Sequence, residues 1–224
     1  PVLHRRMFPF VDAAPFTSAM ARRGNLRDTL TRDAGWPDDT SILLAVGMMR
    51  AGAKQGSYEQ LAAALPQLSG ENWRLLVAGD GPQRGEIEAM LEAAAPGRVK
   101  LLGALPADRL AEIYALSDIL VWPAVDEAFG IALLEAQAAG LPVVAGKARG
   151  VPDIIGSGVT GLLPPAGDPG AFAKAVQRLI DDPELRGRMG SAAARRVRAK
   201  FDLPTASAML ASTLNTVSIA RPAP

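Results

Sequence analysis

Residues 119–135 read Ile-Leu-Val-Trp-Pro-Ala-Val-Asp-Glu-Ala-Phe-Gly-Ile-Ala-Leu-Leu-Glu, and the order of their parts indicates how the chain folds. Residues 119–122 form a short apolar run that ends at Pro123, which is typical of a buried strand. From Gly130 the apolar residues return at helical spacing, so a helix is predicted over 130–139, closed by Gly140. A buried strand, a polar loop and an apolar helix in this order make up the repeating unit of a parallel sheet.

The same unit recurs on both sides of this stretch. Apolar runs without polar alternation predict strands covered on both faces, at 42–46, 73–78, 99–102, 119–122, 142–145 and 161–163. Helical spacing of apolar residues predicts helices between them, at 57–65, 83–94, 107–116 and 130–139. This alternation predicts an α/β fold with a doubly wound parallel sheet and helices on both faces.

The chain outside these units is predicted to be mainly helical. Residues 1–40 are expected to be a lead-in segment with a first helix near 26–34. Beyond residue 167 only helices are expected, over 168–180, 183–201 and 204–219. We therefore expect one compact domain over 41–202, followed by a C-terminal helix and tail over 203–224.

Composition and charge exclude several classes of function. The 224 residues include 24 basic and 23 acidic side chains, which argues against a dedicated nucleic-acid-binding protein. There is no cysteine and only one histidine, His4, so a thiolate site, a histidine metal cluster and a Ser/His/Asp triad are not expected. The lack of cysteine fits a reducing compartment, and we expect a cytoplasmic location.

No membrane span is expected, because no apolar run approaches the roughly 18–20 residues that a span needs. The basic face of the helix over 183–201 is expected to be solvated, and peripheral contact with the inner face of a membrane is the alternative. The chain begins with Pro1 rather than Met and has no signal peptide, so we interpret it as part of a longer protein.

Ligands of open α/β sheets bind beyond the carboxyl ends of the strands, so the loops after the strands are the candidate sites. The loop over 47–54 begins at Gly47 and carries two cations that suit a phosphate, Arg50 and Lys54. A flexible loop with solvated charges is the alternative. The loop over 79–82 lacks both GxGxxG and a P-loop motif and is predicted to be a turn, with Asp80 as a helix cap. The loop over 146–155 either closes over a ligand or turns the chain.

The loop before the predicted helix at 130–139 holds the strongest candidates. Gly130 at the helix entry leaves backbone N–H groups of Gly130, Ile131 and Ala132 free to hold an anion. Glu135 lies in an otherwise apolar stretch, where a carboxylate is costly without partners, and ribose hydroxyls would be suitable ones. Glu127 can face a ligand from the loop. The alternative is a surface Glu127 and a Glu135 that its neighbours satisfy.

Glu127 and Glu135, with seven residues between them, match an E-x7-E motif. Other matching segments follow in natural order and spacing, at 77–82, 101–103, 114–118, 133–136, 140–144, 158–163 and 181–185. The chain from about 40 to 201 thus resembles the carboxyl-terminal, donor-binding domain of a retaining glycosyltransferase of the GT-B fold, glycosyltransferase family 4 (group 1) in particular. The resemblance implies a Rossmann-like domain that forms one half of a GT-B fold.

The resemblance also implies a role for each matching residue. Glu127 should lie near the donor sugar and the reacting centre, and Lys54 should neutralise the leaving diphosphate. Glu135 should bind the ribose hydroxyls of a nucleotide sugar. Further contacts are implied for the loop and for the end of the third strand. These nucleotide-sugar-binding residues are Gly47, Arg50, Leu101, Gly103, Phe129, Gly130, Ile131 and Ala132.

The sequence departs from the family in two respects. The common form has Gly-Arg at the end of the first strand, whereas here Met48 follows Gly47 and Arg50 comes two positions later. The domain that mainly binds the acceptor in this family, a sugar or lipid-linked glycan, would lie upstream and is absent. This fragment alone is therefore expected to bind a nucleotide sugar without transferring sugar efficiently.

The implied reaction transfers a sugar from a nucleotide diphosphate sugar to an acceptor hydroxyl with retention of configuration. No cofactor and no metal site are expected in this domain. Two alternatives remain: a catalytically inactive nucleotide-sugar-binding module, or a GT-B epimerase or phosphorylase.

Overall fold

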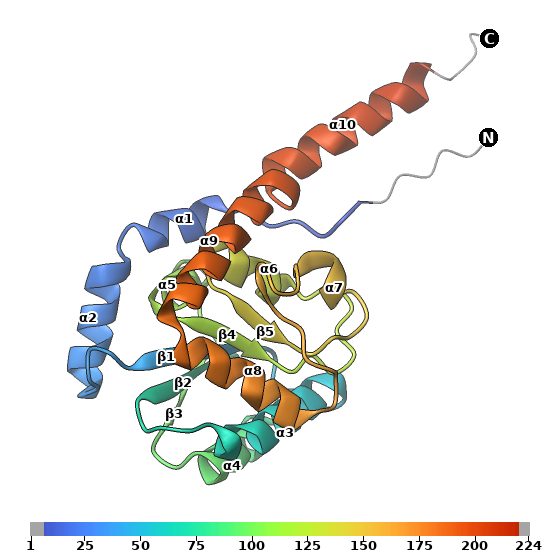
Figure 1. Ribbon diagram of the computed structural model, residues 1–224. Helices are drawn as coiled ribbons and strands as arrows, with labels where there is room; N and C mark the ends of the chain where they lie inside the picture. The colour runs from blue at the N-terminus through green and yellow to red at the C-terminus, as the bar shows by residue number, and fades with distance from the viewer. Residues whose placement is uncertain (1–6, 220–224) are drawn as a thin grey trace.

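The computed structural model describes residues 7–219 and contains a six-stranded sheet in which every paired strand is parallel (Figure 1). The strands lie in the order β3-β2-β1-β4-β5-β6. Their bounds are β1 Ser41–Val46, β2 Trp73–Ala78, β3 Val99–Gly103, β4 Ile119–Trp122, β5 Val143–Ala145 and β6 Gly161–Leu162. This order confirms the predicted doubly wound, Rossmann-like sheet, because successive connections run first to one side of β1 and then to the other.

Helices cover both faces of the sheet, as predicted. One face carries α3 (Ala53–Ala64), α4 (Arg84–Ala94) and α8 (Pro169–Asp181), and the other carries α1 (Ala14–Met20), α2 (Arg23–Ala34), α5 (Ala107–Leu116) and α6 (Ile131–Ala138). The long α9 (Pro183–Lys200) packs on α6 and α8. The remaining elements are the 3₁₀ turn η1 (Leu65–Gln67), the short α7 (Val151–Ile154) and α10 (Leu203–Ile219).

The core lies between the central strands and these two helical layers. Ile42, Leu43 and Leu44 of β1 are fully buried, as are Leu75 and Leu76 of β2. A strand that is apolar on both faces has no solvated side, which is why polar alternation is missing from the sequence of these strands.

The amino-terminal segment differs from its prediction. It contains two helices rather than one, because α1 is only seven residues long and has only two buried residues, Phe16 and Ala19, to mark it. α2 begins at Arg23, earlier than expected, and α3 begins at Ala53, directly after Gly52 with its positive φ of 86°. His4 and the tail after residue 219 lie outside the described residues.

The predicted cap of α4 is wrong. Gln83 occupies the N-cap position, while the Asp80 carboxylate accepts a hydrogen bond from the Gly81 N–H at 2.7 Å and pairs with Arg84 at 3.2 Å. The carboxylate therefore stabilises the turn after β2 from within, and Arg84 connects it to the first turn of α4. The loop over 146–155 also differs from a plain turn, because it contains α7.

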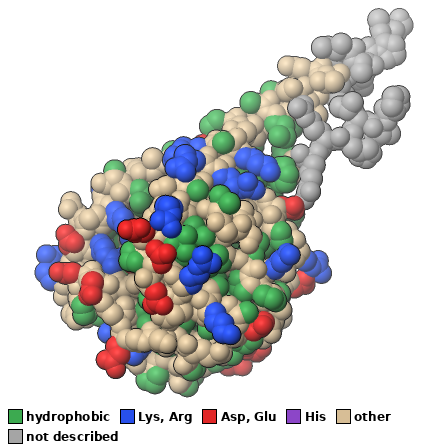
Figure 2. Space-filling view, in the orientation of Figure 1, with side chains coloured by type: hydrophobic (Ala, Val, Ile, Leu, Met, Phe, Trp, Pro, Cys, Tyr) green, Lys and Arg blue, Asp and Glu red, His purple; other side chains and the backbone are tan. Residues whose placement is uncertain are grey.

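The segment before α1 is paired with the segment that joins α9 to α10. The Val11 N–H donates to the Phe201 carbonyl at 2.9 Å, and the Leu203 N–H donates to the Val11 carbonyl at 3.0 Å. Beyond this pairing α10 projects away from the body, with Leu203, Leu210 and Leu214 exposed (Figure 1). Figure 2 shows basic and acidic side chains interspersed over one face of the body and no patch of charge on α10. None of the helices within residues 7–219 is long and apolar enough to cross a membrane.

The ends of β1, β2 and β3 are joined by backbone contacts that leave no room for side chains. The Gly47 N–H donates to the Ala78 carbonyl at 3.0 Å, and the Gly79 N–H donates to the Gly103 carbonyl at 2.9 Å. A Cβ atom on Gly79 would lie 1.9 Å from the Gly47 carbonyl oxygen, and Gly79 has a φ of 147°. Glycine at position 79 thus allows the first two loops to run side by side beyond the sheet.

We expect Gly79→Ala to lower the free energy of unfolding by about 3 kcal/mol, because overpacking and an unfavourable φ both oppose it. Urea unfolding followed by circular dichroism measures this change. Gly85→Ala is the matched control, since its Cβ would meet no atom within 4 Å and the residue lies in α4. The control should be neutral or slightly stabilising. Equal midpoints for Gly79→Ala and the unsubstituted protein would contradict the close approach.

Candidate functional site

The main candidate site lies where the strand order changes direction. β1 and β4 are neighbours in the sheet, while the loops that follow them lead to helices on opposite faces. The loop ends diverge there, and a cavity of about 610 Å³ opens between them. Open α/β sheets bind ligands in this crevice, so the fold itself selects the position.

The cavity brings together most of the residues predicted for the site. They come from the loop after β1, the start of α3, the loop after β4 and the first turn of α6. The predicted residues that line it are Gly47, Arg50, Lys54, Glu127, Phe129, Gly130, Ile131 and Ala132. Leu101, Gly103 and Glu135 are not among its lining residues.

An ion pair lies at the centre of this lining. The Lys54 ammonium is 2.7 Å from Oε2 of Glu127, and the two side chains are 22% and 16% exposed. α3 supplies the cation and the loop after β4 supplies the carboxylate. The ion pair therefore links the two chain segments that follow β1 and β4. A partly buried pair is screened less than a surface pair, and its charges still meet the cavity.

An aromatic pair supports the ion pair. Trp122, the last residue of β4, is 2% exposed, and its ring lies 5.1 Å from the Lys54 ammonium, within the range of a cation–π contact. Tyr58 of α3 packs edge-on against Trp122 at 5.1 Å, and its hydroxyl donates to the Gly47 carbonyl at 2.8 Å. The Tyr58–Trp122 pair therefore holds the end of β1 against the end of β4, beside the Lys54 ammonium.

The loop after β4 is held in a strained shape. Ala124 and Asp126 have positive φ values of 55° and 57°, a region that costs non-glycine residues energy. The Val125 N–H donates to the Ser57 hydroxyl of α3 at 3.0 Å, and Asp126 pairs with Arg149. These contacts keep the loop in a conformation that directs Glu127 toward Lys54.

The amino end of α6 faces the cavity. Gly130 is its N-cap with a φ of 63°, and its N–H donates to Oε1 of Glu127 at 3.3 Å. Ile131 and Ala132 follow as the first helical residues, whose N–H groups have no partner within the helix. The helix dipole adds a partial positive charge at the same place, so an anion is favoured there.

Glu135 lies one turn further into α6 than the lining residues. Its side chain shares a helix face with Ile131 and points toward the amino end of the helix. The Tyr114 hydroxyl donates to Oε2 of Glu135 at 2.8 Å and also contacts the Ala132 carbonyl at 3.2 Å. Burial raises the pKa of Glu135, while the Tyr114 hydrogen bond acts in the opposite direction.

The structure places Leu101 and Gly103, the residues predicted at the end of the third strand, beside the cavity rather than on its surface. The Gly103 carbonyl is occupied by the Gly79 N–H, as described above. The next residues along the chain, Ala104 and Leu105, line the cavity together with Leu110 of α5. An apolar surface therefore lies at the end of the cavity nearest β3.

Sequence reasoning missed three contributors to this site. The sequence pattern gives Trp122 only as a strand residue, Tyr58 only as an apolar helix position, and Tyr114 as an apolar helix position within a matching segment. Each is an aromatic side chain with a polar atom, and a buried tyrosine or tryptophan usually needs a hydrogen-bond partner. The rule predicts that each of these residues has a hydrogen-bond partner. It does not predict that the partner belongs to the site.

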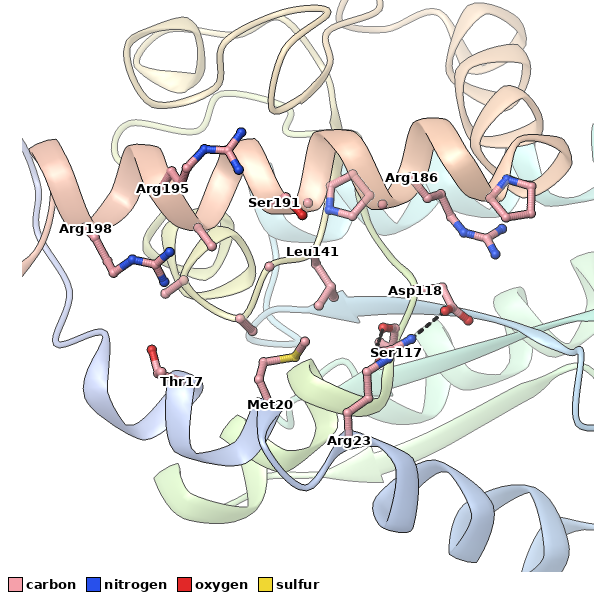
Figure 3. Close-up of a pocket in the computed structure, with 18 residues that line it drawn as sticks. Thr17, Met20, Arg23, Ser117, Asp118, Leu141, Arg186, Ser191, Arg195 and Arg198 are labelled. Carbon is pink, nitrogen blue, oxygen red and sulfur yellow. Dashed lines mark hydrogen bonds and ion pairs between the residues drawn. The ribbon is translucent and has the colours of Figure 1, made fainter.

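A second cavity, of about 640 Å³, lies at the opposite edge of the sheet between α1, α9 and the loops before β4 and β5 (Figure 3). Arg23 donates to the Ser117 carbonyl at 2.6 Å and to Asp118 at 2.7 Å. Arg186 donates to the Leu179 and Ile180 carbonyls at 2.9 and 3.0 Å. These two arginines are thus used to cap backbone groups, and we assign this cavity a structural role.

The described residues contain no group of three or more His, Cys, Asp or Glu side chains placed to hold a metal ion. In the main cavity the charge available for an anion comes instead from Lys54, Arg50 and the end of α6. Such a set suits a phosphate-containing ligand with a neutral or polar extension toward Glu127.

The fold and the site together define a Rossmann-like domain with a cavity suited to an anionic ligand at its switch point. A family model described as "Glycosyl transferases group 1" matches residues 27–196, most of the chain. The chain belongs to this family of glycosyltransferases.

Known relatives agree with this assignment. The chain is 32% identical over 218 residues to an alpha-D-kanosaminyltransferase from Streptomyces kanamyceticus, a match that covers 97% of this chain and 55% of the relative. It spans about half the length of such relatives.

Solved structures share the fold. Sucrose-phosphate synthase from Thermosynechococcus elongatus is 27% identical with a TM-score of 0.79, covering 95% of this chain and 52% of that one. Anabaena HepE in complex with UDP-glucose is 24% identical with a TM-score of 0.76, covering 92% and 56%. The C-terminal domain of the group 1 protein LpcC from Francisella tularensis is 23% identical with a TM-score of 0.70, covering 86% and 99%.

The raised pKa of Glu135 predicts a pH-dependent effect on stability. The folded state keeps a proton that the unfolded state releases, so stability falls as pH rises from the ordinary glutamate pKa through the folded one. We expect Glu135→Gln to stabilise the protein more at pH 7 than at pH 4, because the amide is never charged.

Chemical unfolding at the two pH values measures this difference. The matched control is Glu59→Gln, which makes the same change at an exposed position of α3. A Glu135→Gln variant that is less stable at pH 7 than at pH 4, relative to the unsubstituted protein, would mean that the ionised carboxylate is stabilised.

Proposed function

We propose that this chain is the donor-binding, carboxyl-terminal domain of a retaining glycosyltransferase of family 4, which transfers a sugar from a nucleotide diphosphate sugar. The observation that carries the proposal is the Lys54–Glu127 ion pair in the crevice between β1 and β4. A cation for the diphosphate and a carboxylate for the sugar thus lie next to each other, where ligands of this fold bind.

The cavity lining, together with Glu135 one turn further into α6, offers a separate surface for each part of such a donor. The diphosphate would meet Lys54, Arg50 and the N–H groups at the start of α6. The base would lie on the apolar end formed by Ala104 and Leu105. Glu135, directed toward the amino end of α6 and oriented by Tyr114, would receive ribose hydroxyls. Glu127 would face the sugar and the reacting centre.

The comparisons support this assignment of parts. The structure of HepE that shares the fold contains UDP-glucose. The match to LpcC covers nearly all of an isolated C-terminal domain, whereas the match to the kanosaminyltransferase covers about half of the relative. We infer that residues 41–202 form the nucleotide-sugar-binding domain and that the acceptor binds mainly to a further domain.

Catalysis in the proposed enzyme is electrostatic. As the bond between the sugar and the diphosphate breaks, negative charge develops on the diphosphate. The amino end of α6 is fixed where that charge appears, so it needs little reorganisation to stabilise it, and Lys54 brings a positive charge to the same place. In this proposal Lys54 supplies the charge that other transferases take from a metal ion.

A thermal-shift panel tests the proposed function directly. The protein is heated with UDP, GDP, ADP and their glucose or mannose conjugates, each with and without magnesium. A ligand at a hundred times its Kd stabilises by about 2.7 kcal/mol, which is roughly 5–10 °C for a domain of this size. One base should be preferred, without a requirement for magnesium. No shift with any nucleotide would refute the proposal.

Lys54→Ala should weaken binding of the nucleoside diphosphate about ten- to a hundredfold, because a charge-assisted contact is lost. Binding of the bare nucleoside should change little. Titration calorimetry measures both, with Lys174→Ala as control, since Lys174 is exposed on α8 away from the cavity. Equal losses for nucleoside and diphosphate would remove Lys54 from the phosphate site.

Glu135→Gln should weaken nucleotide binding by about ten- to a hundredfold through loss of charge-assisted hydrogen bonds. The loss should shrink for a nucleotide that lacks the 2′- or 3′-hydroxyl, because the missing hydroxyl is the proposed partner. Calorimetry with the ribose and deoxyribose forms makes the comparison. The same loss with both sugars would show that Glu135 acts elsewhere.

A further inference from the structure

Three hydrogen-bond donors converge on the Glu127 carboxylate. Lys54 Nζ and Trp122 Nε1 both reach Oε2, at 2.7 and 3.3 Å, while the Gly130 N–H reaches Oε1 at 3.3 Å. In the described structure the carboxylate is therefore satisfied on both oxygens. Such a carboxylate keeps its orientation only as long as its donors remain in place.

The three donors differ in how easily they can leave. Lys54 carries its ammonium on a flexible stem and is a point charge that any stronger anion can attract. The Gly130 N–H is fixed in the backbone at the N-cap of α6. Trp122 is buried at the end of β4, and its ring is enclosed by neighbours.

The indole has no alternative position. A Cβ atom on Gly47 would lie 2.7 Å from the Trp122 ring, so only glycine leaves the ring its space. The Tyr58 ring packs edge-on against the indole, with ring centroids 5.1 Å apart. The Tyr58 hydroxyl in turn donates a hydrogen bond to the Gly47 carbonyl. The Nε1–H is thus held toward Glu127 by packing rather than by charge.

A diphosphate in the cavity would compete with Glu127 for Lys54, because two phosphates carry more negative charge than one carboxylate. We infer that Trp122 is a positioning residue: its indole N–H keeps Glu127 directed at the donor sugar after Lys54 has turned to the diphosphate. The inference rests on the proposed function. Trp122 would affect binding of the donor sugar indirectly, by orienting Glu127.

Trp122→Phe removes the N–H and keeps an aromatic ring in the same enclosure. We expect it to weaken binding of a nucleotide sugar about tenfold more than binding of the matching nucleoside diphosphate. The probes are UDP-glucose and UDP, or the GDP or ADP pair if the thermal-shift panel selects that base. Trp73→Phe is the matched control, a buried tryptophan at the amino end of β2 that is absent from the cavity lining. It should leave the two affinities in their original ratio.

A double-mutant cycle separates positioning from packing. In a Glu127→Ala background the additional loss caused by Trp122→Phe should disappear, because there is no carboxylate left to orient. Additive losses, or equal losses for the nucleotide sugar and the diphosphate, would overturn the inference. Failure of the unsubstituted protein to bind any nucleotide would instead refute the proposed function.

A spectroscopic measurement makes the test independent of how well Trp122→Phe folds. The protein has three tryptophans, so nitrogen–proton spectra contain at most three indole N–H resonances. The Trp122 resonance should move in Glu127→Ala, and in the unsubstituted protein it should remain protected from exchange when UDP or the selected diphosphate is added. A resonance unaffected by Glu127→Ala, or exposed to exchange when the diphosphate binds, would contradict the inferred hydrogen bond.

Discussion

The close approach of the Gly47 and Gly79 backbones is the constraint on which the site depends. A side chain on Gly79 would overlap the Gly47 carbonyl, and one on Gly47 would overlap the Trp122 ring. With both absent, the loops after β1, β2 and β4 can lie against one another. This packing places the start of α3, and therefore Lys54, within reach of the loop that carries Glu127. The positions of Lys54 and Glu127 in the cavity thus depend on glycine, which has no Cβ atom, at residues 47 and 79.

The two edges of the sheet have opposite characters. At the amino edge, Asp118 accepts hydrogen bonds from Arg23, Arg27 and the Ile42 N–H, at 2.7, 2.8 and 2.8 Å. These hydrogen bonds connect α2 to β1 and β4. At the carboxyl edge, the loop after β4 is strained, and the amino end of α6, Arg50 and Lys54 present positive charge to the cavity. Backbone strain is costly in a fold, and the described non-glycine residues with positive φ, Ala124, Asp126 and Arg149, all lie in loops at this edge, where the rigid sheet supports them.

The sequence predicts the fold well because each buried strand is apolar on both faces and ends at glycine or proline. Most of the residues that it predicts for the site also line the cavity, since loops that follow parallel strands lie at the carboxyl edge. The prediction fails where tertiary packing decides. The helix α1 is too short, with only two buried residues, for its periodicity to be recognised, and Asp80 stabilises its own turn instead of capping α4.

The sequence also does not predict the contacts of the aromatic residues in the site. Trp122 and Tyr58 are distant in sequence and meet only because β1 and β4 are adjacent, so neither periodicity nor spacing reveals them. Glu135 shows a related limit. Its position in an apolar stretch indicates that it needs a partner, and the structure supplies Tyr114 as one, while the ribose contact stays a prediction.

The pairing of Val11 with Phe201 and Leu203 has a mechanical consequence. The chain enters the body at Val11 and leaves it at Leu203, and the two crossings are hydrogen-bonded to each other on both sides of Val11. The segment before α1 and the start of α10 are therefore tied to each other by a parallel bridge rather than attached to the body independently. Any movement of α10 relative to the sheet must either break these two hydrogen bonds or displace Val11 as well.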